Sequence, residues 1–336
     1  MADTIVTTAS YPNFSGLLFN KGNVETPFST LIAGKAYQTN HVKFAVGQFY
    51  TTAVGTQPEI SEQASLTAPD ATAVKRSQEY NVTQIFQKSF GVSYLKQSDM
   101  GTLSGINVAN QVANPIDEVA FQAAAAMSNI QQDIEYTFIN GKFAESTGAT
   151  VANKSKGILN AITSNTLDAN KKELGYWLLL EAQKSVSEAN GDSYNLVSLL
   201  SGTQLMQVQK DAIENGFTVR QAGDTINGIN ITTILTPYGN LKVALGKYLP
   251  DGTALLVNPN VCAPVFQPVP GKGNFFLEEL PQAGAGNKYQ IYGQAGLDYG
   301  PEWYHAKITN LATTFTAPES GILTRTATAT SAVSKG

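Results

Sequence analysis

Hydrophobic residues recur every three or four positions along residues 114–140, which is the spacing of one face of an α-helix. These positions are Ile116, Val119, Ala123, Met127, Ile130, Ile134 and Phe138. Asn114 and Pro115 suit a helix start, and Gly141 stands where a left-handed residue commonly ends a helix. The pattern predicts one uninterrupted helix of about 25 residues, roughly 37 Å long at about 1.5 Å per residue. Such a helix needs a long surface to lie on.

Apolar and polar residues alternate over residues 41–54 and again over residues 80–94, as they do in half-buried β-strands. In the second stretch one face carries Tyr80, Val82, Phe86, Phe90, Val92 and Tyr94, and the other carries Asn81, Thr83, Gln87, Ser89 and Ser93. The segment between the stretches, residues 55–73, is polar and has too few apolar residues to form a core. The two strands and this tip predict a long hairpin that projects from the body and finds its partner on another molecule.

Residues 1–40 mix Gly, Pro, Asn and Thr with isolated aromatic and aliphatic residues and keep no period for long. We interpret them as an extended arm with aromatic anchors. Residues 142–155 are rich in Gly, Ala, Ser and Thr and are interpreted as a boundary. Residues 259–281 are rich in Pro and Gly and are interpreted as a connection, and residues 313–336 as a polar tail.

The second half of the chain combines helical and strand patterns. One helix is predicted from Asn170, with Glu173 completing a capping box, to Gly191, and another from Ser201, with Gln204 as its box partner, to residue 216. Strands are predicted at residues 217–220, 229–235, 241–245 and 254–257, with a last strand pair at 289–297 and 303–311. Helices packed on a mostly antiparallel sheet indicate the α+β class.

Charge and composition narrow the possible functions. Charged residues make up only 14% of the 336 residues, below the usual quarter, so we expect much of the surface to be covered by copies of the same chain. The net charge of −4 argues against a protein that grips phosphates, because such proteins need a basic face. The first ten residues do not have the basic-then-apolar pattern of a signal peptide, and no stretch approaches 18 apolar residues. We therefore expect an intracellular, soluble protein.

Residues with chemical potential are few and scattered. The chain has two histidines, His41 and His305, and a single cysteine, Cys262, so no cluster matches a zinc site and no intramolecular disulfide can form. The apolar neighbours of Cys262 predict an unreactive thiol. No G-x-S-x-G motif occurs, and none of the Gly-Lys pairs has the context of a phosphate-binding loop. The sequence predicts no catalytic, cofactor-binding or metal-binding residues.

The order of the parts resembles the major capsid protein of tailed double-stranded DNA bacteriophages, with its Hong Kong 97-like fold. Five segments carry the resemblance, in this order along the chain: residues 80–86 (YNVTQIF), 92–93 (VS), 117–122 (DEVAFQ), 133–135 (DIE) and 304–308 (YHAKI).

The resemblance implies a division of the chain into parts. The parts are an N-terminal arm at 1–40, an extended hairpin loop at 41–80, a peripheral domain at 81–156 and 263–312 with a spine helix at 115–140, an axial domain at 157–262, and a C-terminal tail at 313–336. The arm would cross a neighbouring subunit and the hairpin would lie over an adjacent one. Copies of the axial domain would meet around five-fold and six-fold centres.

The resemblance also implies a non-catalytic protein that self-assembles, through pentamers and hexamers, into an icosahedral or prolate shell around double-stranded DNA. The shell would belong to the virion and assemble in the bacterial cytoplasm. Its partners would be itself, a portal and separate scaffolding or decoration proteins, with no sequence-specific DNA contact, no membrane and no cofactor. Two alternatives stay open at this point: an encapsulin-like nanocompartment that holds a cargo enzyme, and an intracellular hydrolase whose acids or serines converge only in three dimensions.

Overall fold

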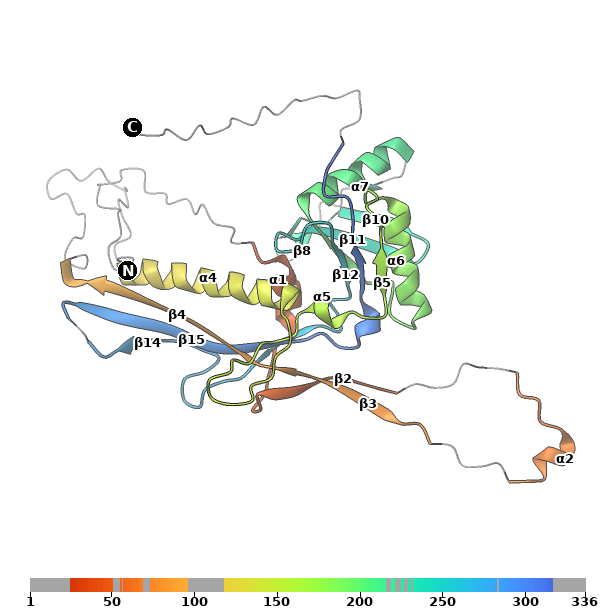
Figure 1. Cartoon of the computed structure of the whole chain (residues 1–336), viewed down its shortest axis with the longest axis horizontal. Helices are drawn as coiled ribbons and strands as arrows, with labels where there is room; N and C mark the ends of the chain where they lie inside the picture. The colour runs from red at the N-terminus through yellow and green to blue at the C-terminus, as the bar shows by residue number, and fades with distance from the viewer. Residues whose placement is uncertain are drawn as a thin grey trace.

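The computed structural model describes residues 25–50, 55, 57–68, 73–95, 118–215, 219–220, 225–226, 229–230, 232–282 and 284–316. Its helices are α1 (Pro27–Ile32), α2 (Glu62–Ser65), α4 (Glu118–Asn140), α5 (Ile158–Ala161), α6 (Tyr176–Glu188) and α7 (Gly202–Asn215), with short 3₁₀ turns η1 (Ala33–Lys35) and η2 (Glu302–Tyr304). Figure 1 shows a body of two sheets with their helices and a hairpin that extends away from it.

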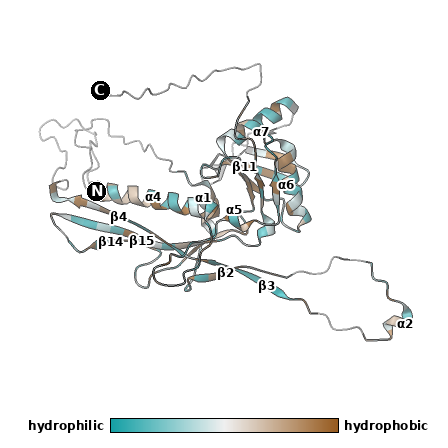
Figure 2. Ribbon diagram, in the orientation of Figure 1, coloured by the Kyte–Doolittle hydropathy of each residue, from teal (hydrophilic) through white to brown (hydrophobic). Residues whose placement is uncertain are grey.

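A five-stranded sheet supports the long helix. Its order is β1 (Tyr37–Gln38), β13 (Ala263–Phe266), β15 (Gly286–Asp298) and β14 (Phe275–Leu280), and β4 (Gln84–Ser93) pairs with β15. Helix α4 lies along β4 and β15 (Figure 1), and its Ala126 and Ile130 pack against Phe86, Ile291 and Ala295. Hydrophilic residues recur along the rest of α4 (Figure 2). The predicted helix is confirmed over 23 residues, and its capped start at Asn114 and Pro115 lies outside the described residues.

A seven-stranded sheet forms the second half of the body. Its order is β5 (Thr166–Asp168), β16 (Ala306–Thr309), β12 (Ala254–Val257), β6 (Val197–Leu200), β11 (Gly239–Leu245), β10 (Thr232–Thr236) and β7 (Val219–Arg220). The pairings of β6 with β11 and of β5 with β16 are parallel, and the other pairings in this sheet are antiparallel. A core that includes Leu179, Ala182 and Val186 of α6 joins the helices to this sheet. A short separate pair consists of β8 (Thr225–Ile226) and β9 (Ile229–Asn230).

The two sheets share one hydrophobic core. Val265 and Leu297 of the five-stranded sheet lie in the same cluster as Leu199 and Leu255 of the seven-stranded sheet, all completely buried. Helices and sheets are therefore mixed in one body, as the predicted α+β class requires.

The described part of the predicted arm is not extended. Residues 25–40 form α1, η1 and β1, and Phe28 and Ile32 of α1 are fully buried in the shared core. The α1 start is held by Glu135 of α4, whose Oε1 and Oε2 accept the N–H groups of Phe28 and Ser29 at 2.8 and 2.7 Å. The side chain that holds the start of α1 thus belongs to a residue 107 positions after Phe28, so local periodicity does not predict this helix.

The predicted strand over residues 80–94 is two strands with different partners. Strand β3 (Arg76–Val82) pairs with β2 (Lys43–Tyr50), and β4 pairs with β15. The change occurs at Thr83, which donates its N–H to the Val42 carbonyl oxygen at 2.8 Å. The alternation continues across this change, so the sequence pattern could not reveal it.

Several boundaries in the second half were wrong. Residues 259–281 are not a plain connection, because they contain β13 and β14, and β6 was missed. The strands β15 and β16, predicted as a pair, belong to different sheets, so residues 306–309 do not complete the sheet under α4. Asn170 has φ 52° in a turn and does not cap α6, which begins at Tyr176.

Two predictions about helix ends, one for the start of α7 and one for the end of α4, had different outcomes. The capping box of α7 is confirmed: the Ser201 N–H donates to Gln204 Oε1 at 2.9 Å, and the Gln204 N–H donates to Ser201 Oγ at 3.4 Å. Gly141 ends α4 as predicted, but not through a left-handed conformation. A Cβ at Gly141 would lie 2.3 Å from the Ser155 carbonyl oxygen, so close backbone approach requires the glycine.

Candidate functional site

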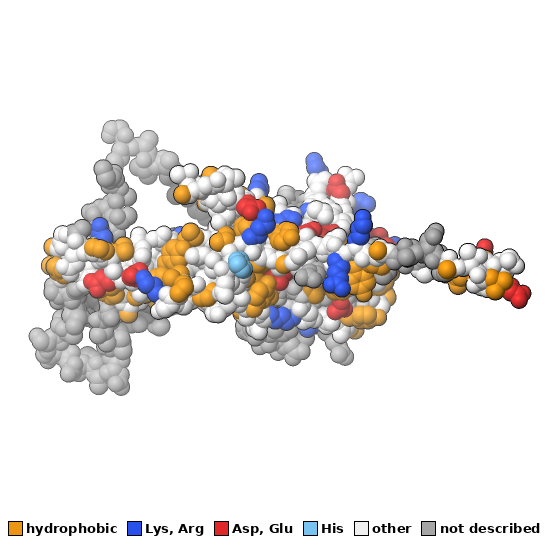
Figure 3. Space-filling view, turned by 90° about the horizontal axis from the view of Figure 1, so that it is seen from below, with side chains coloured by type: hydrophobic (Ala, Val, Ile, Leu, Met, Phe, Trp, Pro, Cys, Tyr) orange, Lys and Arg blue, Asp and Glu red, His pale blue; other side chains and the backbone are white. Residues whose placement is uncertain are grey.

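The most distinctive surface of the molecule is the hairpin formed by β2, β3 and the tip between them (Figure 1). The tip carries the one-turn helix α2, in which Ser61 Oγ accepts the Ala64 N–H at 3.1 Å. Large apolar side chains on the hairpin are exposed: Tyr50, Ile60, Leu66 and Val74. Figure 3 shows hydrophobic and acidic side chains together at the far end of the projection. A two-stranded hairpin is marginally stable alone. We therefore expect the exposed surface of the hairpin to contact a partner outside the subunit.

The hairpin joins the body at Asn81, which is completely buried. Asn81 Nδ2 donates to the carbonyl oxygens of Leu297 at 2.7 Å and Lys156 at 3.1 Å. Asn81 Oδ1 accepts the N–H groups of Val82 at 2.9 Å and Lys156 at 2.8 Å. One side chain therefore ties β3 to β15 and to the segment that follows α4. The sequence pattern placed Asn81 on the polar face of its strand and gave no sign that this side chain is buried.

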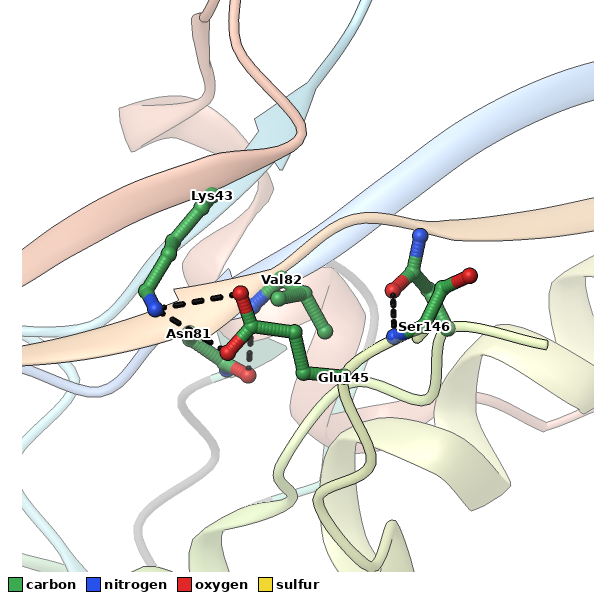
Figure 4. Close-up of polar contacts among 6 residues, drawn as sticks. Lys43, Asn81, Val82, Glu145 and Ser146 are labelled. Atoms are coloured by element: carbon green, nitrogen blue, oxygen red, sulfur yellow. Dashed lines mark hydrogen bonds and ion pairs between the residues drawn. The ribbon is translucent and has the colours of Figure 1, made fainter. Parts of the chain in front are cut away.

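An ion pair accompanies this attachment. Lys43 Nζ lies 3.0 Å from Glu145 Oε2, and the two side chains point toward each other beside Asn81 (Figure 4). Lys43 Nζ also lies 5.2 Å from the centre of the Tyr80 ring. Both members of the pair are about half exposed, so water and salt screen it and its contribution to the free energy of unfolding is small.

A second set of contacts joins the hairpin to residues 299–303. The hydroxyl of Tyr299 donates to Glu79 Oε2 at 2.9 Å, and the rings of Phe49 and Trp303 meet edge to face with centroids 4.8 Å apart. The register of β2 against β3 shifts at Gly47, which has φ 57°. A Cβ at Gly47 would lie 3.3 Å from the backbone of residues 300 and 301. The bulge thus brings the hairpin backbone against the chain that leaves β15.

The two histidines and the cysteine differ in their burial. His41 is exposed at the start of the hairpin, whereas His305 and Cys262 are completely buried. Nε2 of His305 donates to the Tyr299 carbonyl oxygen at 2.7 Å, and Nδ1 accepts the Asn258 N–H at 3.1 Å, so the imidazole is neutral. Burial lowers the pKa of His305 to about 4 and raises the pKa of the Cys262 thiol far above its usual range. Cys262 lies in the apolar setting that the sequence predicted.

Buried acids elsewhere have structural partners. Burial raises the pKa of Glu135, although its hydrogen bonds to residues 28 and 29 act in the opposite direction. Glu302 accepts the N–H groups of Thr163 and Ser164 and the Ser164 hydroxyl. Sequence patterns did not identify either acid as buried, because the groups that hydrogen-bond to them lie far away in the sequence. Within the described ranges, no three His, Cys, Asp or Glu residues could hold a metal ion, and no helix could cross a membrane.

The long helix on a five-stranded sheet, the adjoining seven-stranded sheet and the projecting hairpin together form a Hong Kong 97-like fold. The sequence model of the SU10 major capsid protein family matches residues 1–312, and the chain belongs to that family. It is a shell-forming structural protein. A comparison with curated proteins finds no match to this chain.

Solved structures of capsids and of an encapsulin share the fold at low sequence identity. A chain of the Cyanophage A-1(L) capsid asymmetric unit has a TM-score of 0.62 at 12% identity, covering 90% of this chain and 97% of that chain. A Mycobacterium phage Patience chain has a TM-score of 0.56 at 11% identity, covering 86% and 84%. The SrpI encapsulin of Synechococcus elongatus PCC 7942 also has a TM-score of 0.56 at 11% identity, covering 84% and 88%.

Proposed function

We propose that copies of this protein assemble, through pentamers and hexamers, into a closed icosahedral or prolate shell that encloses double-stranded phage DNA. The observation that carries the proposal is the projecting hairpin, whose apolar tip residues Ile60 and Leu66 are exposed in the single subunit and so can contact another copy. Single contacts of this kind are modest, whereas many simultaneous contacts in a closed symmetric assembly are strong.

Each part of the subunit has a proposed role. The hairpin at residues 41–80 lies over an adjacent subunit, and α4 with the five-stranded sheet forms the peripheral domain. The seven-stranded sheet with α6 and α7 forms the axial domain, which meets its copies around the symmetry centres. Strand β16 belongs to this sheet, so the axial domain includes residues 306–309 as well as 157–262.

The protein acts in the virion without catalysis and assembles in the bacterial cytoplasm. Its other partners are a portal and separate scaffolding or decoration proteins. The net charge of −4 supports confinement of DNA over tight binding, because packaged DNA must also be released. The buried, neutral His305 and the buried thiol of Cys262 support a non-catalytic role.

A second candidate function is an encapsulin-like nanocompartment. The similarity to the SrpI encapsulin chain supports this alternative at the level of the fold. The two functions differ in content, because a capsid holds a genome and a nanocompartment holds a cargo protein.

The test is expression of the full chain alone and together with its neighbouring gene products, followed by light scattering and negative-stain microscopy. Closed particles tens of nanometres across are expected. Nuclease-protected DNA inside the particles would support the capsid, and a cargo enzyme without a genome would support the nanocompartment. A subunit that stays monomeric in every combination would contradict both.

A further inference from the structure

The connection between β15 and β16, residues 299–305, lies between two other parts of the molecule. On one side it contacts the base of the hairpin through Glu79–Tyr299 and Phe49–Trp303. On the other side it contacts residues 258–262, the loop that connects the seven-stranded sheet to β13. We call residues 299–305 the connector and residues 258–262 the junction loop.

Gly300 shows how closely the three parts meet. It has φ 62°, and a Cβ there would lie 2.8 Å from the Val261 carbonyl oxygen and 3.0 Å from Val261 Cβ. The opposite neighbour of this residue is Gly47, at the bulge of β2. The connector backbone therefore lies between the hairpin and the junction loop. At Gly300 there is no space for a side chain on the side of the junction loop.

His305 fixes the far end of the connector. Its Nδ1 accepts the N–H of Asn258, which follows β12, and its Nε2 donates to the carbonyl oxygen of Tyr299, which follows β15. The ring is completely buried, with Cys262 Sγ 3.9 Å from Nε2. One imidazole thus joins the ends of strands that belong to the two different sheets.

From these contacts we infer that the connector couples the position of the hairpin to the junction between the two sheets. Tightly packed elements have few alternative arrangements, so a displacement of Phe49 or Glu79 must move Trp303 and Tyr299, and with them the Asn258–His305 bond. The biological meaning of this coupling rests on the proposed function. When the hairpin docks on a neighbouring subunit and changes position, the angle between the two sheets of its own subunit changes with it.

Hydrogen exchange with mass spectrometry on the unassembled full-length subunit tests the coupling. Phe49→Ala and Glu79→Ala remove the two hairpin contacts independently, and one serves if the other fails to fold. Each is expected to raise exchange in the junction loop about tenfold while leaving the β4–β15 ladder protected. Tyr50→Ala is the matched control, because Tyr50 is the next residue on the hairpin and is 64% exposed.

Coupling is reciprocal, so His305→Gln is expected to raise exchange at residues 47–49 and 77–79. Faster exchange confined to the hairpin in both Phe49→Ala and Glu79→Ala would overturn the inference, as would equal loosening by Tyr50→Ala. The measurement uses unassembled subunits, so a failure of these variants to form shells bears on the proposed function and not on the coupling.

Discussion

The side-chain amide of Asn81 donates a 2.7 Å hydrogen bond to the carbonyl oxygen of Leu297, a residue 216 positions further along the chain. This bond and the two backbone bonds to Lys156 hold the base of the hairpin against β15. One buried polar side chain thus contributes directly to the direction in which the hairpin projects.

Asn81→Ala is expected to lower the free energy of unfolding of the subunit by about 2–4 kcal/mol, because it leaves buried backbone groups of Leu297 and Lys156 without their partner. Denaturant unfolding measures the change. Asn153→Ala is the matched control: Asn153 Oδ1 accepts one bond, from the Ser146 N–H at 2.7 Å, and about 1 kcal/mol is expected. Equal effects of the two substitutions would contradict the role given to Asn81.

The free energy of unfolding is expected to fall as pH falls from about 6.5 to about 4, by about 3 kcal/mol from His305 alone. In this range the unfolded chain binds a proton at residue 305 and the folded chain does not, so acid favours unfolding. His305→Gln should lower the free energy of unfolding at neutral pH and flatten its pH dependence. His41→Gln, which removes the exposed histidine, is the matched control. A profile that keeps its slope without His305 would assign the pH dependence to other groups.

Gly141→Ala is expected to lower the free energy of unfolding by about 3 kcal/mol or more. The new Cβ would lie 2.3 Å from the Ser155 carbonyl oxygen and 2.4 Å from the Thr137 carbonyl oxygen, and neither backbone can move freely. Gly148→Ala is the control, since a Cβ there meets nothing within 4 Å, and its effect should stay within about 0.5 kcal/mol. Thermal unfolding of both variants measures the difference, and a tolerated alanine at 141 would show that α4 can end differently.

Ile60→Ser combined with Leu66→Ser is expected to leave the free energy of unfolding unchanged, because the two residues are 70% and 76% exposed in the subunit. Shell yield should fall at least tenfold if these side chains become buried against another copy, since every subunit loses the same contact. Light scattering and microscopy of particles from the double variant measure the yield. Normal particles would show that the tip is not an assembly contact.

Elements whose signals are local could be predicted from the sequence. The 3.6-residue period of α4, the alternation in β2 and β3, and the Ser201–Gln204 capping box each depend on residues within a few turns or positions of one another, and the structure contains all of them. The absence of any motif for catalysis also followed from residue types and spacing alone.

The tertiary structure decided which strand pairs with which and which polar residues are buried. β3 and β4 lie within one stretch of alternating residues, but their partners β2 and β15 lie far apart in the sequence. Asn81 and Glu135 look like ordinary surface residues until the backbone groups of residues 297 and 28 reach them. The spacing of apolar residues shows only that one face of a helix or strand is covered. The free energy that selects one strand pairing over another comes from contacts between distant segments. Those contacts exist only once the chain has folded.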